Sequence, residues 1–272
     1  MQEFSIAPRE MITSIWRNRG LIAALTKRDV IGRYRGSVMG ILWSFFNPIL
    51  MLVVYTFVFS VVFKARWNVE SDSKTEFALV LFAGLIIFSL FAECVTRAPG
   101  LILSNVNYVK KVVFPLETLP VIALGAALFH GVISLAVWLV FYIIIFGMPH
   151  LTALLLPLII LPLILFIMGL SWLLASFGVY LRDTSQFIGI ITTIMMFLSP
   201  IFYPISALPA EYQFLLQFNP LTPAIEEARN VLIWGKMPSM PILAVYYVGT
   251  AFVAWLGFAL FQKTRKGFAD VI

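Results

Sequence analysis

The chain has 272 residues and a mean hydropathy of +0.97, and its share of charged residues, 12%, is about half that of soluble domains. This composition excludes a water-soluble enzyme or binding domain and predicts an all-α integral membrane protein. The single cysteine, Cys94, excludes an intrachain disulfide framework, and the net charge of +6 has to be interpreted from its distribution along the chain.

The first 37 residues are polar and basic, and they lack the short apolar core of a cleavable signal peptide. Within them, MITSIWRNRGLIAAL (Met11–Leu25) mixes apolar side chains with two arginines, as an amphipathic helix in the membrane interface would. We expect one transmembrane domain over residues 1–272, with an N-terminal amphipathic segment at 1–37, a six-span membrane domain at 38–262 and a tail at 263–272.

Runs without Asp, Glu, Lys or Arg indicate six transmembrane helices, since about 20 apolar residues cross the hydrocarbon of a bilayer. The expected spans are Gly36–Phe63, Phe77–Ala92 with part of residues 93–97, two within Thr118–Leu181 that a turn at Gly147–His150 separates, one within Thr184–Ala210 that ends near Ser199–Pro204, and Met237–Gln262. The sequence therefore predicts a six-helix membrane domain.

The segment 206–238 is too charged for a span, because charged side chains cost about 2.5–3.5 kcal/mol each at the centre of a membrane helix. Thr222 is a candidate N-cap, Pro223 suits a first helical turn, and Gly235 can end the helix. We expect two short re-entrant helices around Asn219–Pro223, dipping into the outer leaflet before the sixth span. An ordinary interfacial loop is the alternative.

The distribution of basic residues predicts the orientation of the chain. With six spans, 14 of the 19 Lys and Arg residues fall on one side, in segments 1–37, 93–117, 182–183 and 263–272, and five fall on the other, in segments 64–76, 147–151 and 206–238. Basic residues accumulate in cytoplasmic loops. Both termini are therefore expected in the cytoplasm.

The sequence contains no motif for ATP binding, metal binding or nucleophilic catalysis. It has no GxxxxGK[ST] loop and no His/Cys/Asp/Glu cluster at metal-ligand spacing, and its two histidines, His130 and His150, fit a packed helix and a turn. Only Glu93 and Arg97, at the margin of one span, provide the acid and base that ion-coupled carriers keep in the membrane. We expect a non-enzymatic chain without a cofactor. Active transport would then need a separate cytoplasmic ATPase that binds the ATP and Mg.

Such an ATPase needs a surface to contact, and the loop between the second and third spans is the first candidate. Ser104–Phe114 is predicted to form a helix with an apolar stripe at Val106, Val109 and Val113, ended by Pro115. The candidate coupling residues are Ser104, Asn105, Asn107, Tyr108, Lys110, Lys111 and Phe114, with Arg182 and Asp183 as a lesser contact between the fourth and fifth spans. The positive-inside rule alone would explain the two lysines, and a solvated turn would explain the second pair.

Five motifs in order carry a resemblance to a known family. They are TKRDVIGRYRGSVMGILW (Thr26–Trp43) followed by Asn47-Pro48, NVNYVKKVVFPLETLPV (Asn105–Val121), GVYLRDTSQ (Gly178–Gln186), SPIFYP (Ser199–Pro204) and NPLTPAIEEAR (Asn219–Arg229). Over nearly the whole chain they resemble the permease subunits of bacterial polysaccharide ABC exporters, which transport O-antigen, capsule or teichoic acid.

This resemblance implies a multi-pass protein of the bacterial inner (plasma) membrane, in which two permease copies pair with two ABC ATPase subunits. The expected substrate is a polysaccharide on undecaprenyl pyrophosphate, most closely O-antigen within lipopolysaccharide biosynthesis. The resemblance also implies that the helix between spans two and three docks on the ATPase. The N-terminal amphipathic helix would lie beside it, and the two short helices would line the outer mouth.

Sugar rings pack on aromatic rings, so aromatic side chains are candidates for the glycan path. The candidates are Trp43, Phe46, Tyr55 and Phe59 on the first span and Phe197, Phe202 and Tyr203 at the fifth; packing or lipid contact is the alternative for each. Glu226, Glu227 and Arg229 are candidates for the outer mouth, and Arg28, Arg33 and Arg35 for contact with the pyrophosphate or with anionic lipid.

Three other functions stay open at this level. A teichoic acid or capsule exporter permease would have the same architecture, as would a related drug or haem exporter permease. A membrane enzyme acting on polyprenyl lipids would need acidic residues at the cytoplasmic interface. Only Glu93, Glu117 and Asp183 are available there, and their spacing is unlike a metal-binding DxD motif.

Overall fold

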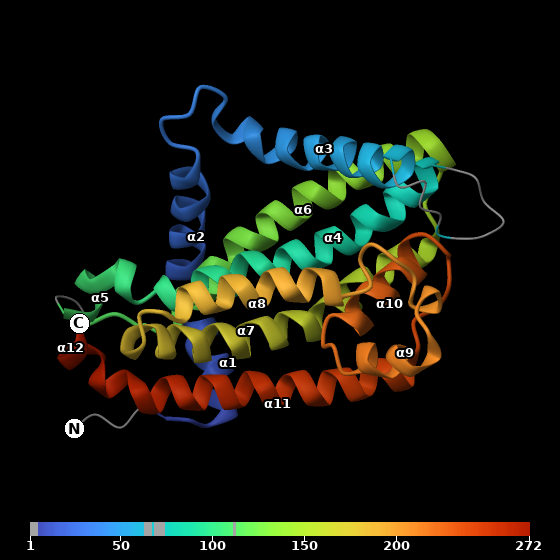
Figure 1. Ribbon diagram of the computed structural model, residues 1–272. Helices are drawn as coiled ribbons and strands as arrows, with labels where there is room; N and C mark the ends of the chain where they lie inside the picture. The colour runs from blue at the N-terminus through green and yellow to red at the C-terminus, as the bar shows by residue number, and fades with distance from the viewer. Residues whose placement is uncertain (1–4, 63–66, 68–73, 111–112) are drawn as a thin grey trace.

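The computed structural model describes residues 5–62, 67, 74–110 and 113–272, and this part of the chain is helical, with no β-strand (Figure 1). The α-helices are α1 (Pro8–Arg17), α2 (Arg19–Arg33), α3 (Trp43–Tyr55), α4 (Lys74–Arg97), α5 (Val106–Lys110), α6 (Thr118–Phe146), α7 (Leu156–Tyr180), α8 (Thr184–Leu198), α9 (Ala210–Gln217), α10 (Thr222–Leu232), α11 (Met240–Thr264) and α12 (Phe268–Val271). The all-α prediction is confirmed.

Five helical segments in the described ranges are long and apolar enough to cross a membrane: Gly40–Phe59, Thr75–Gly100, Thr118–Phe146, Leu151–Tyr180 and Met240–Val271. The second runs through residues 93–97, as expected. A turn that begins at Gly147, whose φ is +83°, separates the third from the fourth. The predicted turn at Gly147–His150 is therefore confirmed.

The first span begins later than expected. Gly36 and Gly40 have φ values of +85° and +53°, a region that glycine enters readily and other residues rarely adopt. The chain therefore turns between α2 and the first span, and its continuous helix starts at Gly40 rather than at Gly36. At the other end α3 continues as a π-helix over Thr56–Val62.

The helix of the fifth expected span ends next to its predicted end near Ser199–Pro204. Helix α8 ends at Leu198, and its 15 residues extend about 22 Å, less than the hydrocarbon thickness of about 30 Å. The cause is Pro200, which disfavours helical geometry in the residue before it. Ser199 is accordingly extended, with ψ of 149°.

Two short helices, α9 and α10, occupy the segment before α11, as predicted. Their junction is fixed by Asn219, whose side-chain oxygen accepts a hydrogen bond from the Leu221 amide at 2.9 Å. The proposed N-cap, Thr222, was wrong, because its hydroxyl is buried without a partner and Leu221 occupies the capping position.

Helix α4 lies at the centre of the bundle and α3 at its edge. Among the 18 most apolar residues of each span, 78% are buried in Thr75–Gly100, which includes most of α4, and 11% are buried in Gly40–Phe59, which contains α3. Helices α7 and α11 approach closely at Gly169 and Gly257, where an added Cβ on Gly257 would collide with the Gly169 carbonyl.

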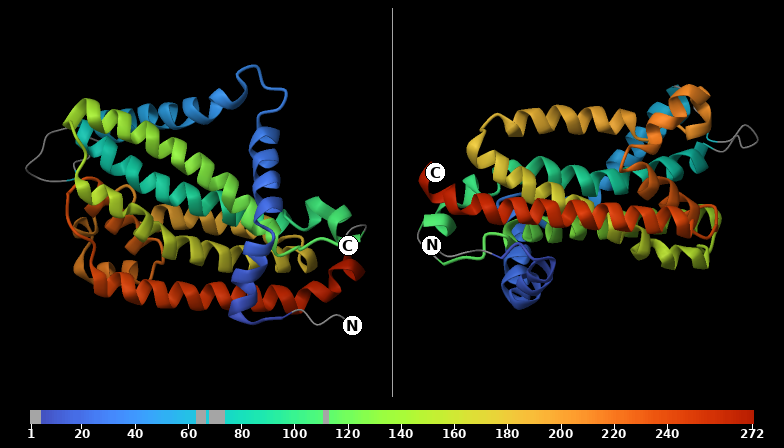
Figure 2. Two further views of the ribbon diagram at one scale, coloured as in Figure 1. Left: turned by 180° about the vertical axis from the view of Figure 1, so that it is seen from behind. Right: turned by 90° about the horizontal axis from the view of Figure 1, so that it is seen from below.

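The elements at the two ends of the bundle differ. Helices α1, α2, α5 and α12 gather at one end, with α1 and α2 crossing the direction of the long helices, and α9 and α10 lie at the opposite end (Figures 1 and 2). The basic N-terminal segment is therefore close to the loop between α4 and α6, as its expected role requires.

Candidate functional site

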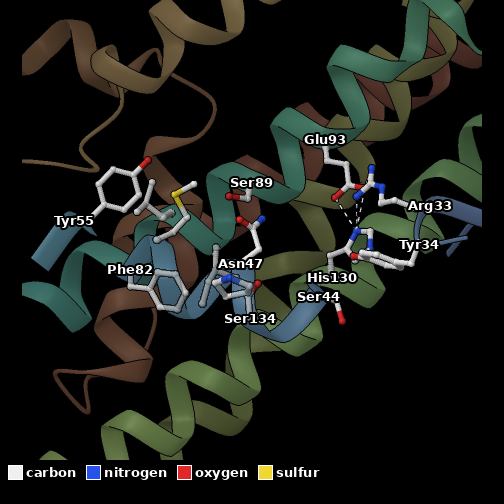
Figure 3. Close-up of a pocket in the computed structure, with 14 residues that line it drawn as sticks. Arg33, Tyr34, Ser44, Asn47, Tyr55, Phe82, Ser89, Glu93, His130 and Ser134 are labelled. Carbon is white, nitrogen blue, oxygen red and sulfur yellow. Dashed lines mark hydrogen bonds and ion pairs between the residues drawn. The ribbon is translucent and has the colours of Figure 1, made fainter. Parts of the chain in front are cut away.

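A cavity of about 330 Å³ lies between the end of α2 and helices α3, α4 and α6 (Figure 3). Its lining is unusually polar for the interior of a membrane domain. The polar lining residues are Arg33, Tyr34, Ser44, Asn47, Tyr55, Ser89, Glu93, His130 and Ser134. Polar side chains inside a membrane domain are costly and commonly functional.

Arg33 and Glu93 form an ion pair at one end of the cavity, and His130 contacts the same carboxylate. The Arg33 guanidinium lies 2.8 Å from the Glu93 carboxylate, and Nδ1 of His130 lies 3.0 Å from the same carboxylate (Figure 3). The Tyr34 hydroxyl is 3.2 Å from His130 Nε2. The expectation that His130 is a packed helix residue is thus refined, since it joins α6 to the acid on α4 and to the end of α2.

A second ionic contact extends this group. Arg97 donates to both carboxylate oxygens of Asp29, at 2.8 and 3.0 Å, and also lies 3.8 Å from Glu93. Asp29, Arg33, Glu93, Arg97 and His130 together form what we call the α2–α4–α6 charge cluster. It fixes the N-terminal segment to the membrane domain, and it engages Arg33, which had been expected to contact lipid headgroups.

The N-terminal segment also contacts the predicted coupling helix directly. Arg28 donates a hydrogen bond to the Tyr108 hydroxyl at 3.0 Å, which joins a residue expected at the lipid headgroups to one expected at the ATPase. Arg35 is exposed in the turn after α2. The structure therefore brings α2 and α5 together at one surface.

The coupling helix is shorter than predicted. A 3₁₀ turn at Leu103–Asn105 leads into α5, whose described residues reach Lys110, and residues 113–115 are not helical, so the predicted end at Phe114 was wrong. Phe114 is buried and stacks on Tyr108 with ring centroids 4.3 Å apart, so this ring contact packs α5 against the loop that follows it. The predicted coupling residue Lys111 lies outside the described residues.

The polar residues of this loop differ in exposure. Ser104, Asn107 and Lys110 are exposed, whereas the Asn105 amide donates to the Leu101 carbonyl at 2.9 Å. Arg182 and Asp183 are exposed in the turn between α7 and α8, at the same end of the bundle. The exposed side chains of Ser104, Asn107, Lys110, Arg182 and Asp183 therefore give this end of the bundle a polar surface.

Sequence reasoning missed the buried residue that follows this loop. The carboxylate of Glu117 accepts hydrogen bonds from the Ser14 hydroxyl and the Arg265 guanidinium, both at 2.7 Å, and its backbone carbonyl accepts one from the Trp172 indole at 2.9 Å. Arg265 also donates to the Phe114 carbonyl at 2.9 Å. Glu117 thus joins α1, α6, α7 and the turn after α11. The only feature of the sequence that pointed to this role was the position of Glu117 as a single acid between Pro115 and Pro120.

Four of the predicted path aromatics meet at the far ends of α3 and α8. Phe202 stacks on Phe59 at 5.0 Å between ring centroids and lies 6.2 Å from Tyr55 and 5.8 Å from Phe197. Tyr203 donates to the Phe197 carbonyl at 3.0 Å. Two others on the same span, Trp43 and Phe46, are exposed on α3 and are not part of this aromatic cluster.

The residues predicted at the outer mouth are tied into the fold. Arg229 is 1% exposed and donates to the carbonyls of Val80, Pro200 and Ile201 and to the Glu226 carboxylate. Burial lowers the pKa of Arg229 to about 10, so it remains charged at neutral pH.

Arg229 also lies under the Trp67 ring, 4.2 Å from its centroid. The second acid, Glu227, is buried and accepts from the Ser239 amide at the start of α11 at 3.2 Å. Arg229 therefore faces inward, contrary to the expected position on a mouth surface. Across the described ranges, no group of three or more His, Cys, Asp or Glu side chains is placed to hold a metal ion.

Comparison with known proteins gives relatives along the whole chain. The profile of the ABC-2 type transporter family matches residues 20–233. An O-antigen export system permease protein RfbA of Myxococcus xanthus is 28% identical over 265 residues, which cover 96% of this chain and 99% of that protein. A Klebsiella pneumoniae protein of the same name is 26% identical, covering 93% and 95%. A polysialic acid transport protein KpsM of Escherichia coli is 24% identical, covering 90% and 93%.

Proposed function

The chain belongs to the ABC-2 type transporter family, and from this premise we propose that it is the transmembrane subunit of an ATP-driven exporter of a lipid-linked polysaccharide. The observation that carries the proposal is the likeness, over 96% of the chain, to a protein named as an O-antigen export permease. We propose O-antigen as the glycan and undecaprenyl pyrophosphate as its lipid carrier.

Energy would come from a separate cytoplasmic ABC ATPase, which would bind the ATP and Mg. We place its docking surface on α5, because Ser104, Asn107 and Lys110 are exposed there and the Tyr108–Phe114 stack supports the helix from behind. Arg182 and Asp183 would add a second contact at the same end of the bundle. The Arg28–Tyr108 hydrogen bond would carry movement of α5 to the N-terminal helices.

In this proposal the chain crosses the inner membrane six times, with both termini in the cytoplasm. Helix α8 would be the short fifth span, completed by the non-helical segment after Ser199. Residues 5–33 and α12 share one end of the bundle, and the bias of Lys and Arg assigns that end to the cytoplasm. Helices α9 and α10 would then lie at the periplasmic face.

The glycan would pass along α3 and α8, where Tyr55, Phe59, Phe197 and Phe202 form the aromatic cluster and Tyr203 lies beside it. Helix α3 exposes much of its apolar surface in the single chain. We propose that a second copy packs near this surface, so that the path forms in a homodimer. Trp43 and Phe46 would extend the path towards the cytoplasm.

Charged residues would act at the two ends of this path. Arg28 and Arg35 are exposed and would attract the pyrophosphate or anionic lipid. Arg33 would contribute its positive charge from within the charge cluster, where it pairs with Glu93. At the outer mouth, Glu226, Glu227 and Arg229 would act by holding α10 in place rather than by touching the glycan.

A genetic experiment tests the proposed function. Deleting the gene should remove the polysaccharide from the cell surface and leave the lipid-linked polymer inside the cell, and the wild-type chain should restore export. Unchanged surface polysaccharide in the deletion strain would contradict the proposal.

A further inference from the structure

The polar cavity between α2, α3, α4 and α6 contains more hydrogen-bonding groups than the charge cluster uses. Beyond that cluster it is lined by Asn47 on α3, Ser89 on α4 and Ser134 on α6 (Figure 3). The side chains of these three residues make no hydrogen bond to another described residue. Polar groups without partners are costly inside a membrane domain, so three of them at one cavity point to a ligand that supplies the partners.

Ser89 is exposed on a helix that is otherwise buried. From Phe77 to Phe91 every other residue of α4 is buried, and Ser89 alone in this stretch is exposed. The cavity that Ser89 lines accounts for this exposure. The central helix of the bundle therefore places a hydroxyl, rather than an apolar side chain, at the wall of the cavity.

The lining residues follow the helical period. Ser89 and Glu93 are four residues apart on α4, and residues at this spacing lie on one face of a helix. His130 and Ser134 have the same spacing on α6. The lining of α4 extends from Phe82 to Glu93, which is eleven residues or about 16 Å. The cavity is therefore elongated along the bundle, as a site for a chain of linked units would be.

Helix α3 adds a backbone acceptor at the same place. Pro48 lies inside α3 and has no N–H, so it cannot donate to the carbonyl of Ser44, four residues earlier. Both residues line the cavity, and the Ser44 hydroxyl itself donates to the Ile41 carbonyl at 2.6 Å. Helix α3 therefore has a carbonyl without its helical donor where it borders the cavity.

The cavity adjoins the aromatic cluster through one shared residue. Tyr55 lines the cavity, and its ring centroid lies 6.2 Å from that of Phe202 and 6.4 Å from that of Phe59. Aromatic rings pack on the C–H faces of sugars, whereas amides and hydroxyls exchange hydrogen bonds with sugar hydroxyls. The two kinds of surface, side by side, suit a carbohydrate.

From these observations we infer that the polar cavity binds sugar residues of the exported glycan, an inference that rests on the proposed function. Asn47, Ser89 and Ser134 would exchange hydrogen bonds with sugar hydroxyls, which are neutral and both donate and accept, as these side chains do. A phosphate fits less well, because Arg33 and His130 in the lining already contact Glu93.

A sugar in this position would lie next to α2. Arg33 and Tyr34, at the end of α2, line the same cavity. On the same helix, Arg28 donates its hydrogen bond to Tyr108 of α5. The bound sugar would therefore contact the element that joins the membrane domain to the predicted docking surface.

Equilibrium binding to the complex of this chain and its ATPase, held in nanodiscs without nucleotide, tests the inference. The probe is the tritiated polysaccharide of the source cell, released from its lipid by mild acid so that only sugar contacts are measured. Asn47→Leu should weaken binding about fivefold, as expected for one lost hydrogen bond. Ser89→Leu should weaken it about tenfold or more, because the larger side chain also fills the cavity.

Two exposed positions outside the lining provide matched controls. Thr96→Val removes a hydroxyl from α4, and Ala136→Leu adds a larger side chain to α6. Both variants should bind the glycan as the wild type does. Equal binding by the wild type, Asn47→Leu and Ser89→Leu would overturn the sugar site and leave the proposed function standing.

The failure of the inference is distinguishable from the failure of the proposed function. A wild-type complex that binds no free glycan, although its gene restores export to the deletion strain, would overturn the sugar site alone. Unchanged surface polysaccharide in the deletion strain would contradict the proposed function, and the inference with it.

Thermal unfolding separates a ligand site from a structural role. Asn47→Leu and Ser89→Leu remove polar groups that have no partner in the fold, so both variants should unfold at or above the wild-type midpoint. Lower midpoints for both variants would overturn the claim that these side chains serve a ligand.

A lipid headgroup with neutral hydroxyls is the competing source of the same chemistry. Phosphatidylglycerol, titrated in a second arm and followed by native mass spectrometry, should be retained equally by the wild type and Asn47→Leu. Weaker retention of this lipid by Asn47→Leu, with glycan binding unchanged, would assign the cavity to the headgroup and overturn the sugar site.

Discussion

The carboxylate of Glu117 and the guanidinium of Arg265 lie 2.7 Å apart, although 148 residues separate them in the sequence. Both side chains are largely buried, and Ser14 donates to the other carboxylate oxygen. The loop after α5, the N-terminal helix and the turn after α11 therefore meet at one acid. If an ATPase docks on α5 as proposed, a displacement of α5 would reach all three elements through Glu117.

Glu117→Gln should destabilise the protein strongly. The amide cannot balance the charge of Arg265, and removing one partner of a buried ion pair typically costs about 3–5 kcal/mol. The thermal unfolding midpoint of the purified chain in detergent measures this loss. Glu10→Gln is the matched control, because its pair with Arg17 is exposed and should be worth less than about 1 kcal/mol. Equal midpoints for the two variants would contradict the role of Glu117.

Arg229→Met should also destabilise the protein, by about 3 kcal/mol or more. The change leaves the carbonyls of Val80, Pro200 and Ile201 without their donor, and a buried unpaired group costs about 1–3 kcal/mol. Thermal unfolding again provides the measurement, with Arg35→Met at an exposed arginine as the control. A wild-type midpoint in Arg229→Met would show that these contacts do not hold α10 in place.

The spans could be predicted from the sequence because lipid requires long runs without charge, and four of the expected helices were placed closely on that basis. Their ends were less predictable. Gly36 and Gly40 decide where the first span begins, and a hydropathy run does not register this backbone effect. The end of α8 was predictable, because Pro200 marks it in the sequence.

The site could be predicted only in part. Chemistry and spacing identified the aromatic residues of α3 and α8, four of which lie together. The pairs Arg33–Glu93 and Glu117–Arg265 could not be predicted, since each joins segments far apart in the chain and a single sequence contains no information on which charges meet.

Phe202→Ala should lower the export rate if the aromatic cluster forms part of the glycan path. Losing one aromatic contact of about 0.5–1.5 kcal/mol predicts a two- to tenfold decrease, and Phe202→Tyr should preserve most of the activity. Surface polysaccharide in the complemented deletion strain is the measurement. Phe252→Ala, at an exposed position on α11, is the control. Full export by Phe202→Ala at wild-type protein levels would remove Phe202 from the path.

Reversing the charge on the predicted docking surface should separate ATP hydrolysis from export. Lys110→Glu combined with Lys111→Glu should leave the chain folded in the membrane, because Lys110 is exposed, while export falls and ATP hydrolysis by the assembled complex no longer responds to substrate. Lys236→Glu, an exposed lysine at the opposite end of the bundle, should leave both activities unchanged. Normal export in the double variant would argue against docking on α5.

Reconstituted transport tests the central claim most directly. Proteoliposomes containing this chain, its ATPase and a labelled lipid-linked O-antigen would be assayed with a glycosidase on the side opposite to the ATPase. The account predicts that the labelled glycan becomes accessible to the enzyme only when ATP is supplied and hydrolysed. Glycan that stays protected despite continuing ATP hydrolysis, or that becomes accessible without ATP, would contradict the account.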